Sequence, residues 1–261
     1  MGNSGLVAIV TGASRGVGAA TAKLLSEKGY RVVINYSKSE AEARAIQEAC
    51  SALGGEALLC RADVSEDEDC RRMVEKTLDQ WGRVDVLVNN AGTTKFCAHN
   101  NLDGLSKEDF LHIYSVNLVG PYQMIRAVAP HMKRNGKGAI VNMASIAGVK
   151  AIGSSVAYMT SKAALINLTV VMARVLGPEI RVNAVCPGFI QGEWLEQGLG
   201  KEVYAMAKAF WEQNVPLHRT ATPDIVARTV LYFIEEATLV TGETLILDGG
   251  YHLMGPVAPK G

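Results

Sequence analysis

The stretch LVAIVTGASRGVG, from Leu6 to Gly18, indicates the fold more clearly than any other part of the chain. Its apolar start, Leu6–Val10, is typical of a strand buried on both faces of a sheet. Glycines follow at positions 12, 16 and 18, before a helical pattern over Ala19–Lys28. This order lets backbone amides approach a pyrophosphate at the N-terminus of a helix. The spacing is G-x-x-x-G-x-G rather than G-x-G-x-x-G, and a glycine-rich turn also occurs for packing alone.

Strand-like and helix-like segments alternate through the rest of the chain. Further apolar runs of strand length lie at 31–36, 56–60, 84–88, 139–143, 180–185 and 244–247. Helical patterns lie at 40–53, 66–81, 156–176 and 223–236, and Ser106 and Asp109 have capping-box spacing at the start of another helix. This alternation predicts one three-layer α/β domain over residues 1–261, a Rossmann fold with a doubly wound parallel sheet of about seven strands.

Composition narrows the class of protein. The 26 Lys and Arg residues balance 26 Asp and Glu residues, so no basic surface for nucleic acid or an anionic membrane is indicated. The five cysteines are scattered, without C-x-x-C or a His at metal-ligand spacing, which favours reduced thiols and no metal site. The first residues lack a signal-peptide pattern. We therefore expect a cytoplasmic protein with neither a nucleic-acid nor a membrane partner.

A second stretch, SIAGVKAIGSSVAYMTSK from Ser145 to Lys162, carries the predicted chemistry. Ser145 follows a predicted strand, and Tyr158 and Lys162 leave one face of a predicted helix because they are four residues apart. A nearby ammonium favours the phenolate and lowers the pKa of Tyr158, while Ser145 can bind the oxygen of a carbonyl or alcohol. No side chain carries a hydride, so this patch predicts a nicotinamide cofactor.

Charges near the second predicted strand favour NADP(H) over NAD(H). An acidic residue about 20 residues after the glycines ordinarily binds the ribose hydroxyls when the 2′-phosphate is absent. Here the strand leads into Ser37 and Lys38, with no acid before Glu40. Arg15 in the glycine loop and Lys38 suit a 2′-phosphate, although both could equally be solvated surface charges.

Three further features leave alternatives open. Asp63 suits either an adenine amine or a cap for the next helix. Asn117 precedes Gly120-Pro121, a pair expected to interrupt helical hydrogen bonding, so its amide points inward, binds water or is purely structural. Residues 189–221 show no strand pattern and contain Trp194, Tyr204, Phe210 and Trp211, which favours a substrate lid or an ordinary helical hairpin.

Together these residues resemble the single-domain form of the short-chain dehydrogenase/reductase family, from Val7 to Gly250. The matching motifs are TGASRGVG at 11–18, DV at 63–64, NNAG at 89–92, Asn117, Ser145, Y-x-x-x-K at Tyr158 and Lys162, and PG at 187–188. Within the family the chain looks most like the 3-oxoacyl-carrier-protein reductases, and sugar, steroid and small-alcohol enzymes look similar.

The resemblance implies NAD(P) binding, a small carbonyl or alcohol substrate such as a 3-oxoacyl thioester, and a homotetramer. It implies a catalytic tetrad of Asn117, Ser145, Tyr158 and Lys162, with Lys162 also holding the nicotinamide ribose and Asn117 placing a water in a relay to it. The implied cofactor-binding residues are Gly12, Ser14, Arg15, Gly16, Val17, Gly18, Asn35, Tyr36, Ser37, Asp63, Val64, Asn89, Ala91, Gly92, Tyr158, Lys162, Pro187, Gly188 and Ile190. Where the family often has a cofactor-contacting Thr after Ile190, this chain has Gly192.

Two other classes of function are weighed against an oxidoreductase. A non-catalytic dinucleotide-binding sensor or scaffold would have the same fold, but the intact Ser/Tyr/Lys set argues against it. A serine hydrolase would need G-x-S-x-G around Ser145, and Met143 and Ala147 occupy the glycine positions.

Overall fold

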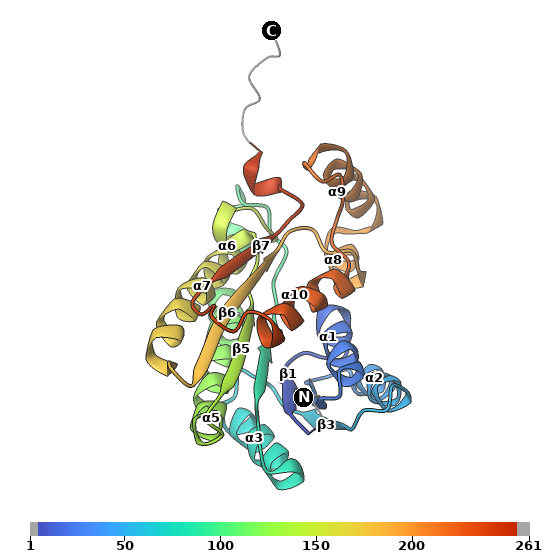
Figure 1. The fold of residues 1–261 in the computed structure, drawn as a ribbon. Helices are drawn as coiled ribbons and strands as arrows, with labels where there is room; N and C mark the ends of the chain where they lie inside the picture. The colour runs from blue at the N-terminus through green and yellow to red at the C-terminus, as the bar shows by residue number, and fades with distance from the viewer. Residues whose placement is uncertain (1–4, 255–261) are drawn as a thin grey trace.

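A computed structural model describes residues 5–254 and confirms the predicted sheet. Seven parallel strands lie in the order β3-β2-β1-β4-β5-β6-β7 (Figure 1). The strands are β1 (Val7–Val10), β2 (Arg31–Tyr36), β3 (Ala57–Arg61), β4 (Val86–Asn89), β5 (Gly138–Met143), β6 (Ile180–Pro187) and β7 (Thr244–Leu247). The strand order reverses between β1 and β4, and open α/β sheets bind ligands at the carboxyl ends of the strands at such a point.

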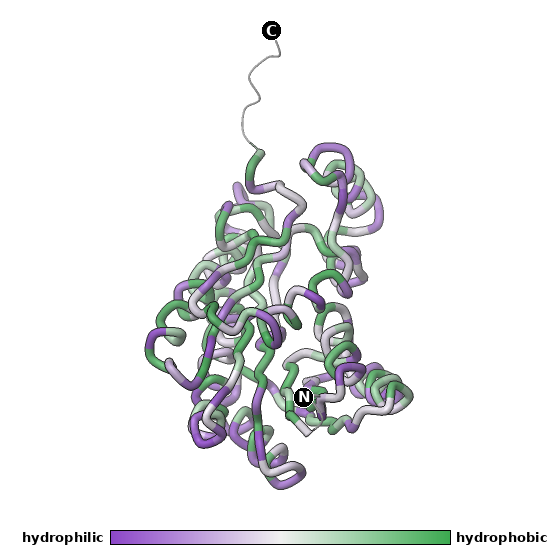
Figure 2. Tube along the Cα trace, in the orientation of Figure 1, coloured by the Kyte–Doolittle hydropathy of each residue, from purple (hydrophilic) through white to green (hydrophobic). Residues whose placement is uncertain are grey.

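Helices cover both faces of the sheet, which explains why its strands are continuous apolar runs. One face packs against α1 (Gly16–Glu27), α2 (Glu40–Ala52) and α10 (Pro223–Glu235), and the other against α3 (Asp67–Trp81), α5 (Gly120–Arg134) and α7 (Val156–Leu176). In β1, Ala8 and Val10 belong to the first core and Ile9 to the second. In Figure 2 the strands in the middle of the molecule are mostly green, for hydrophobic residues, and the helices around them alternate between hydrophobic and hydrophilic residues.

The helix around Asn117 is continuous but changes its winding. The predicted capping box of Ser106 and Asp109 begins α4 (Lys107–Tyr114), a π-helical turn follows at Ser115–Val119, and α5 continues directly from Gly120. The α-helical hydrogen-bond pattern is therefore interrupted, by a π-helical turn just before Gly120, but the helix does not end there. Pro121 lies in the first turn of α5, and its missing N–H is accommodated by the wider turn around Asn117.

Residues 189–221 form two helices beyond the carboxyl end of the sheet, α8 (Glu193–Leu199) and α9 (Lys201–Asn214) (Figure 1). A bridge between Ile190 and Ala221 closes the base of this excursion. The Trp211 ring of α9 stacks on Tyr251 with centroids 4.3 Å apart. Shorter elements are 3₁₀ turns at Leu102–Gly104 and Tyr251–Leu253 and the helix α6 (Ala147–Lys150).

Candidate functional site

The loop between β1 and α1 is fixed in place by hydrogen bonds with polar side chains. The Gly12 amide donates to Asn35 Oδ1 at 3.0 Å, and Asn90 Nδ2 donates to the carbonyls of Thr11 and Gly12 at 2.9 and 3.0 Å. Thr11 Oγ1 accepts from the amides of Asn90 and Ala91. These bonds fix the turn after β1 against the turn after β4, at the point where the strand order reverses.

Two glycines make this loop suitable for a pyrophosphate. Gly16 has φ +57 and open space where a side chain would start, whereas a Cβ on Gly18 would lie 2.4 Å from the Gly12 carbonyl oxygen. Arg15 is the N-cap of α1 and its side chain makes no capping hydrogen bond. The first amides of α1 are therefore not capped by a side chain and point where an anion would bind, so these residues fit a dinucleotide.

Two of the expected cofactor-binding residues are turned inward instead. Asn35 is 2% exposed, and besides accepting from Gly12 its amide donates to the carbonyls of Cys60 and Ala62. Asn89 is also 2% exposed and donates to Asn142 Oδ1 at 2.9 Å. Both side chains thus hold the framework of the site. Asn90, which sequence reasoning did not single out, holds the glycine loop itself.

Asp63 and Val64 follow β3 at the expected edge. Asp63 Oδ1 accepts from the amide and hydroxyl of Ser65 at 3.0 and 2.7 Å, so it forms a turn before α3, whose N-cap is Glu66. Asp63 is exposed and Val64 is buried. The capping alternative is therefore wrong in detail, because the carboxylate closes the preceding turn and does not cap the helix.

The strand end of β5 and one face of α7 bring Ser145, Tyr158 and Lys162 together. The Ser145 hydroxyl lies close enough to Tyr158 to lower the pKa of its phenol, and Ser145 Oγ accepts from the Ala147 amide at 3.1 Å. Lys162 Nζ lies 5.6 Å from the centre of the Tyr158 ring. Tyr158 and Lys162 therefore do share one face of α7, as their spacing predicted. Ser145 approaches them from the loop that follows β5.

The pKa values of this pair differ from expectation. Burial raises the pKa of the Tyr158 phenol to about 12, even though the hydrogen bond with Ser145 lowers it. Burial also lowers the pKa of the Lys162 ammonium to about 8. The prediction that Lys162 lowers the pKa of Tyr158 is therefore wrong in this structure. Surroundings of low polarity disfavour the charged forms of both groups, and burial is the largest cause of both pKa shifts.

Asn117 lies beside these groups but its amide is engaged. Its Nδ2 donates to the Thr93 carbonyl at 2.9 Å and to Ser161 Oγ at 3.0 Å, and its Oδ1 accepts from the Thr93 amide at 2.8 Å. A Cβ on Gly92 would lie 3.5 Å from Asn117 Oδ1 and 3.6 Å from Lys162 Nζ. The NNAG turn, Asn117 and Lys162 therefore meet at one point of the site.

The segment after β6 closes the far side of the site. Pro187 ends β6, and a Cβ on Gly188 would lie 2.7 Å from the Trp211 ring, so the backbone passes close beneath α9. At the position where a Thr was expected, the Gly192 amide donates to the Tyr204 hydroxyl at 3.3 Å. Tyr204 of α9 thus contacts the start of α8, where Gly192 offers no side chain for capping.

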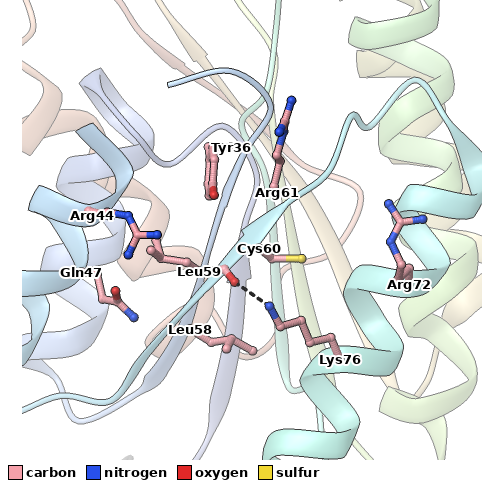
Figure 3. A pocket seen from close by; sticks show the side chains of 9 residues that line it. All are labelled: Tyr36, Arg44, Gln47, Leu58, Leu59, Cys60, Arg61, Arg72 and Lys76. Carbon is pink, nitrogen blue, oxygen red and sulfur yellow. Dashed lines mark hydrogen bonds between the residues drawn. The ribbon is translucent and has the colours of Figure 1, made fainter. Parts of the chain in front are cut away.

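A hollow of about 560 Å³ adjoins the ends of β2 and β3 (Figure 3). Tyr36 and Arg61 are register partners on these strands, and the figure shows them side by side. Arg61 Nε donates to the Ser37 carbonyl at 3.3 Å. The other cations that line the hollow are Arg44, Arg72 and Lys76. Sequence reasoning missed Arg61, and its proximity to Ser37 follows only from the strand register.

Comparisons with known proteins identify the family. A family model described as enoyl-(acyl carrier protein) reductase matches residues 12–252. The relative named ketoacyl reductase 2 of the granaticin polyketide synthase of Streptomyces violaceoruber is 40% identical over 95% of this chain and 96% of its own length. The 3-oxoacyl-[acyl-carrier-protein] reductase of Staphylococcus epidermidis is 36% identical over 94% of this chain and 98% of its own length.

Solved structures agree. A crystal structure assigned to a short-chain dehydrogenase/reductase from Burkholderia xenovorans has a TM-score of 0.89 and 33% identity, and covers 96% of this chain and 99% of its own. The structure of NAD⁺-bound xylitol dehydrogenase has a TM-score of 0.87 and 29% identity. The match covers 95% of this chain and 99% of the dehydrogenase chain. The chain therefore belongs to the short-chain dehydrogenase/reductase family of oxidoreductases, which bind a nicotinamide dinucleotide.

Two further observations concern the described residues. Within residues 5–254 no three His, Cys, Asp or Glu side chains are grouped to hold a metal ion. In the same range α7 is the one helix with the length and apolar composition of a membrane span, and it packs against β6. The same helix carries Tyr158 and Lys162 on its buried side, and Val170 and Val175 on its outer side are exposed.

Proposed function

We propose that the protein is an NADP(H)-dependent oxidoreductase that interconverts a carbonyl and a secondary alcohol, with 3-oxoacyl thioesters as the leading substrate class. The observation that carries the proposal is the placement of Ser145 and Lys162 beside Tyr158, at the carboxyl end of a sheet whose first turn suits a pyrophosphate. The names of the two relatives, a ketoacyl reductase and a 3-oxoacyl reductase, support this substrate class.

The residues of the site divide the work. When bound, the cofactor supplies or accepts the hydride. The Tyr158 hydroxyl moves the proton to or from the substrate oxygen, and Ser145 holds that oxygen by a hydrogen bond. Lys162 provides positive charge beside the phenol and a donor for the ribose. Asn117 acts through Ser161, whose hydroxyl donates to the Tyr158 carbonyl at 2.7 Å, and so positions the first turn of α7.

The proposal of NADP(H) rests on the cations around the ends of β2 and β3. The position at the end of β2, where an acid would bind ribose hydroxyls, is occupied by Tyr36. Arg15, Lys38 and Arg61 are exposed, and in the described part of the chain none of the three forms an ion pair. By contrast, Arg44 and Arg72 are neutralised by Glu40 and Asp69. Three unpaired cations at this edge favour a 2′-phosphate.

Two exposed apolar surfaces support assembly into a homotetramer. One lies on the outer face of α7, where Val170 and Val175 are 50% and 55% exposed. The other lies at α10 and β7, where Tyr232 and Leu245 are 47% and 38% exposed. Two separate self-complementary patches generate a tetramer with two kinds of two-fold interface. Light scattering of the purified protein tests this, and a monomer would contradict it.

The cytoplasm is the compartment that suits the cysteines. Four of the five, Cys50, Cys60, Cys70 and Cys186, are buried, and all five are free thiols. Such unpaired thiols persist under reducing conditions.

The direct test of the proposed function is oxidation of NADPH, followed by its absorbance, with 3-oxoacyl thioesters and simple ketones. NADH is assayed in parallel. We expect turnover with NADPH and at least one ketone. Failure of both cofactors with every substrate, and in the reverse direction with the alcohols, would contradict the proposal. The alternative of a non-catalytic sensor is not supported by the comparisons, since the relatives are reductases.

A further inference from the structure

Three aromatic rings from distant parts of the chain meet beside the proposed proton donor. The Trp194 ring of α8 lies 6.3 Å from the Tyr158 ring and 5.7 Å from the Phe96 ring, centroid to centroid. Phe96 belongs to the segment after β4, and Tyr158 to α7. We call Phe96 and Trp194 the aromatic wall. Because Tyr158 is its neighbour, the wall borders the place where a substrate carbonyl would lie.

A glycine allows the two rings of the wall to pack. A Cβ on Gly198 would lie 1.9 Å from the Phe96 ring, so only a residue without a side chain lets Phe96 dock against α8. Phe96 is half-buried by this contact, whereas 40% of Trp194 is exposed. Phe96 therefore fixes Trp194 from the side, and the indole keeps an accessible surface.

Polar side chains around the wall are already engaged with the protein. Thr94 Oγ1 and Ser154 Oγ are 2.7 Å apart, His99 Nε2 is 2.8 Å from the Gly153 carbonyl, and Lys95 is paired with Asp109 at 2.6 Å. The hydroxyls of a bound polyol would therefore find no free partner among these side chains, and binding that leaves buried hydroxyls without hydrogen bonds is strongly disfavoured. A flat apolar group, in contrast, gains contact with an indole face.

From this arrangement we propose that the substrate carries a planar, apolar ring at or next to its carbonyl carbon, and that this ring packs against Trp194. The inference rests on the proposed function and narrows the carbonyl compounds that it covers to those with such a ring, so a 3-oxoacyl thioester is a good substrate only if it carries one. Trp194 is then a specificity-determining residue. Tyr158 transfers the proton to the same carbonyl that the ring on Trp194 orients.

A pair of substrates and three variants test the proposal by turnover. The substrates are 1-tetralone, a ketone fused to an aromatic ring, and ethyl acetoacetate, an open-chain 3-oxo ester. We expect Trp194→Leu and Trp194→Ala to lower kcat/KM for 1-tetralone about fivefold more than for ethyl acetoacetate, because leucine keeps apolar contact but loses the flat face. Phe210→Ala is the matched control, since Phe210 lies on α9 and is 47% exposed. Equal losses on both substrates would overturn the proposal.

A binding measurement separates this inference from the proposed function. Without cofactor no turnover takes place, so 1-tetralone can be titrated at equilibrium while tryptophan fluorescence is recorded. We expect saturable quenching in the wild type, loss of most of it in Trp194→Phe, and full retention in Phe210→Ala. If no ketone is turned over but this quenching is seen, the proposed function is contradicted, while binding of a planar ring at Trp194 is supported. If quenching is absent in the wild type, or unchanged in Trp194→Phe, the proposal that a ring packs against Trp194 is overturned.

Discussion

Lys162 donates a 2.7 Å hydrogen bond from Nζ to the main-chain carbonyl of Met143, the last residue of β5. The side chain is 4% exposed, so a potential cation is held at the end of the sheet with almost no contact with water. A carbonyl dipole compensates only part of the desolvation of an ammonium. Burying the Lys162 ammonium next to Tyr158 therefore lowers the free energy of unfolding, as expected where function and stability compete.

That cost predicts a pH-dependent gain in stability for Lys162→Met. The pKa of Lys162 falls from 10.5 to about 8 on folding, so between pH 8 and 10.5 the unfolded state binds more protons. Stability contributed by this group therefore rises with pH across that window, and the penalty is largest below pH 8. We expect Lys162→Met to gain about 2 kcal/mol more, relative to wild type, at pH 7 than at pH 10. Urea unfolding at both pH values measures this, and a pH-independent difference would contradict it.

The unpaired cation at the end of β3 predicts a change in cofactor preference. Arg61→Gln removes a charge that forms no salt bridge in the described part of the chain, beside the proposed position of the 2′-phosphate. We expect KM for NADPH to rise about tenfold with KM for NADH within twofold. Arg72→Gln is the matched control, because Arg72 lines the same hollow but is paired with Asp69. Similar effects of the two variants would contradict the assignment of Arg61.

The inward amide of Asn35 predicts a loss of stability. Asn35→Ala removes hydrogen bonds to Gly12, Cys60 and Ala62 from a buried site and leaves their polar groups without that partner. We expect the free energy of unfolding to fall by about 2–4 kcal/mol. Ser37→Ala, two residues further on and exposed, should change it by less than about 0.5 kcal/mol. Urea titrations measure both changes. If Asn35→Ala is as stable as the wild type, Asn35 does not hold the framework of the site.

Much of the fold follows from the sequence because its signals are local. The run at Leu6–Val10 is apolar throughout, the run at 139–143 is apolar except for Asn142, and glycines mark the turn after the first. The direction in which a side chain points, in contrast, depends on segments that are distant in the sequence. Asn35 and Asn89 stand at strand ends near the ligand edge, yet both amides point into the protein, and only the neighbouring strands decide this.

The site was predicted less completely for the same reason. The i, i+4 spacing of Tyr158 and Lys162 gives their shared face, but not the burial that raises one pKa and lowers the other. The pairing of Arg61 with Tyr36 depends on strand register. The contact of Trp194 with Tyr158 depends on how α8 packs, which no spacing in the sequence reports.

The central claim is that the Tyr158 hydroxyl transfers the proton, and Tyr158→Phe tests it most directly. The variant removes one oxygen and leaves the ring beside Trp194 and Lys162 in place. With a ketone that the wild type reduces, we expect kcat to fall by at least about 10³-fold, while the Kd for NADPH, measured by fluorescence, stays within threefold. A variant that keeps more than a tenth of wild-type kcat would contradict the account.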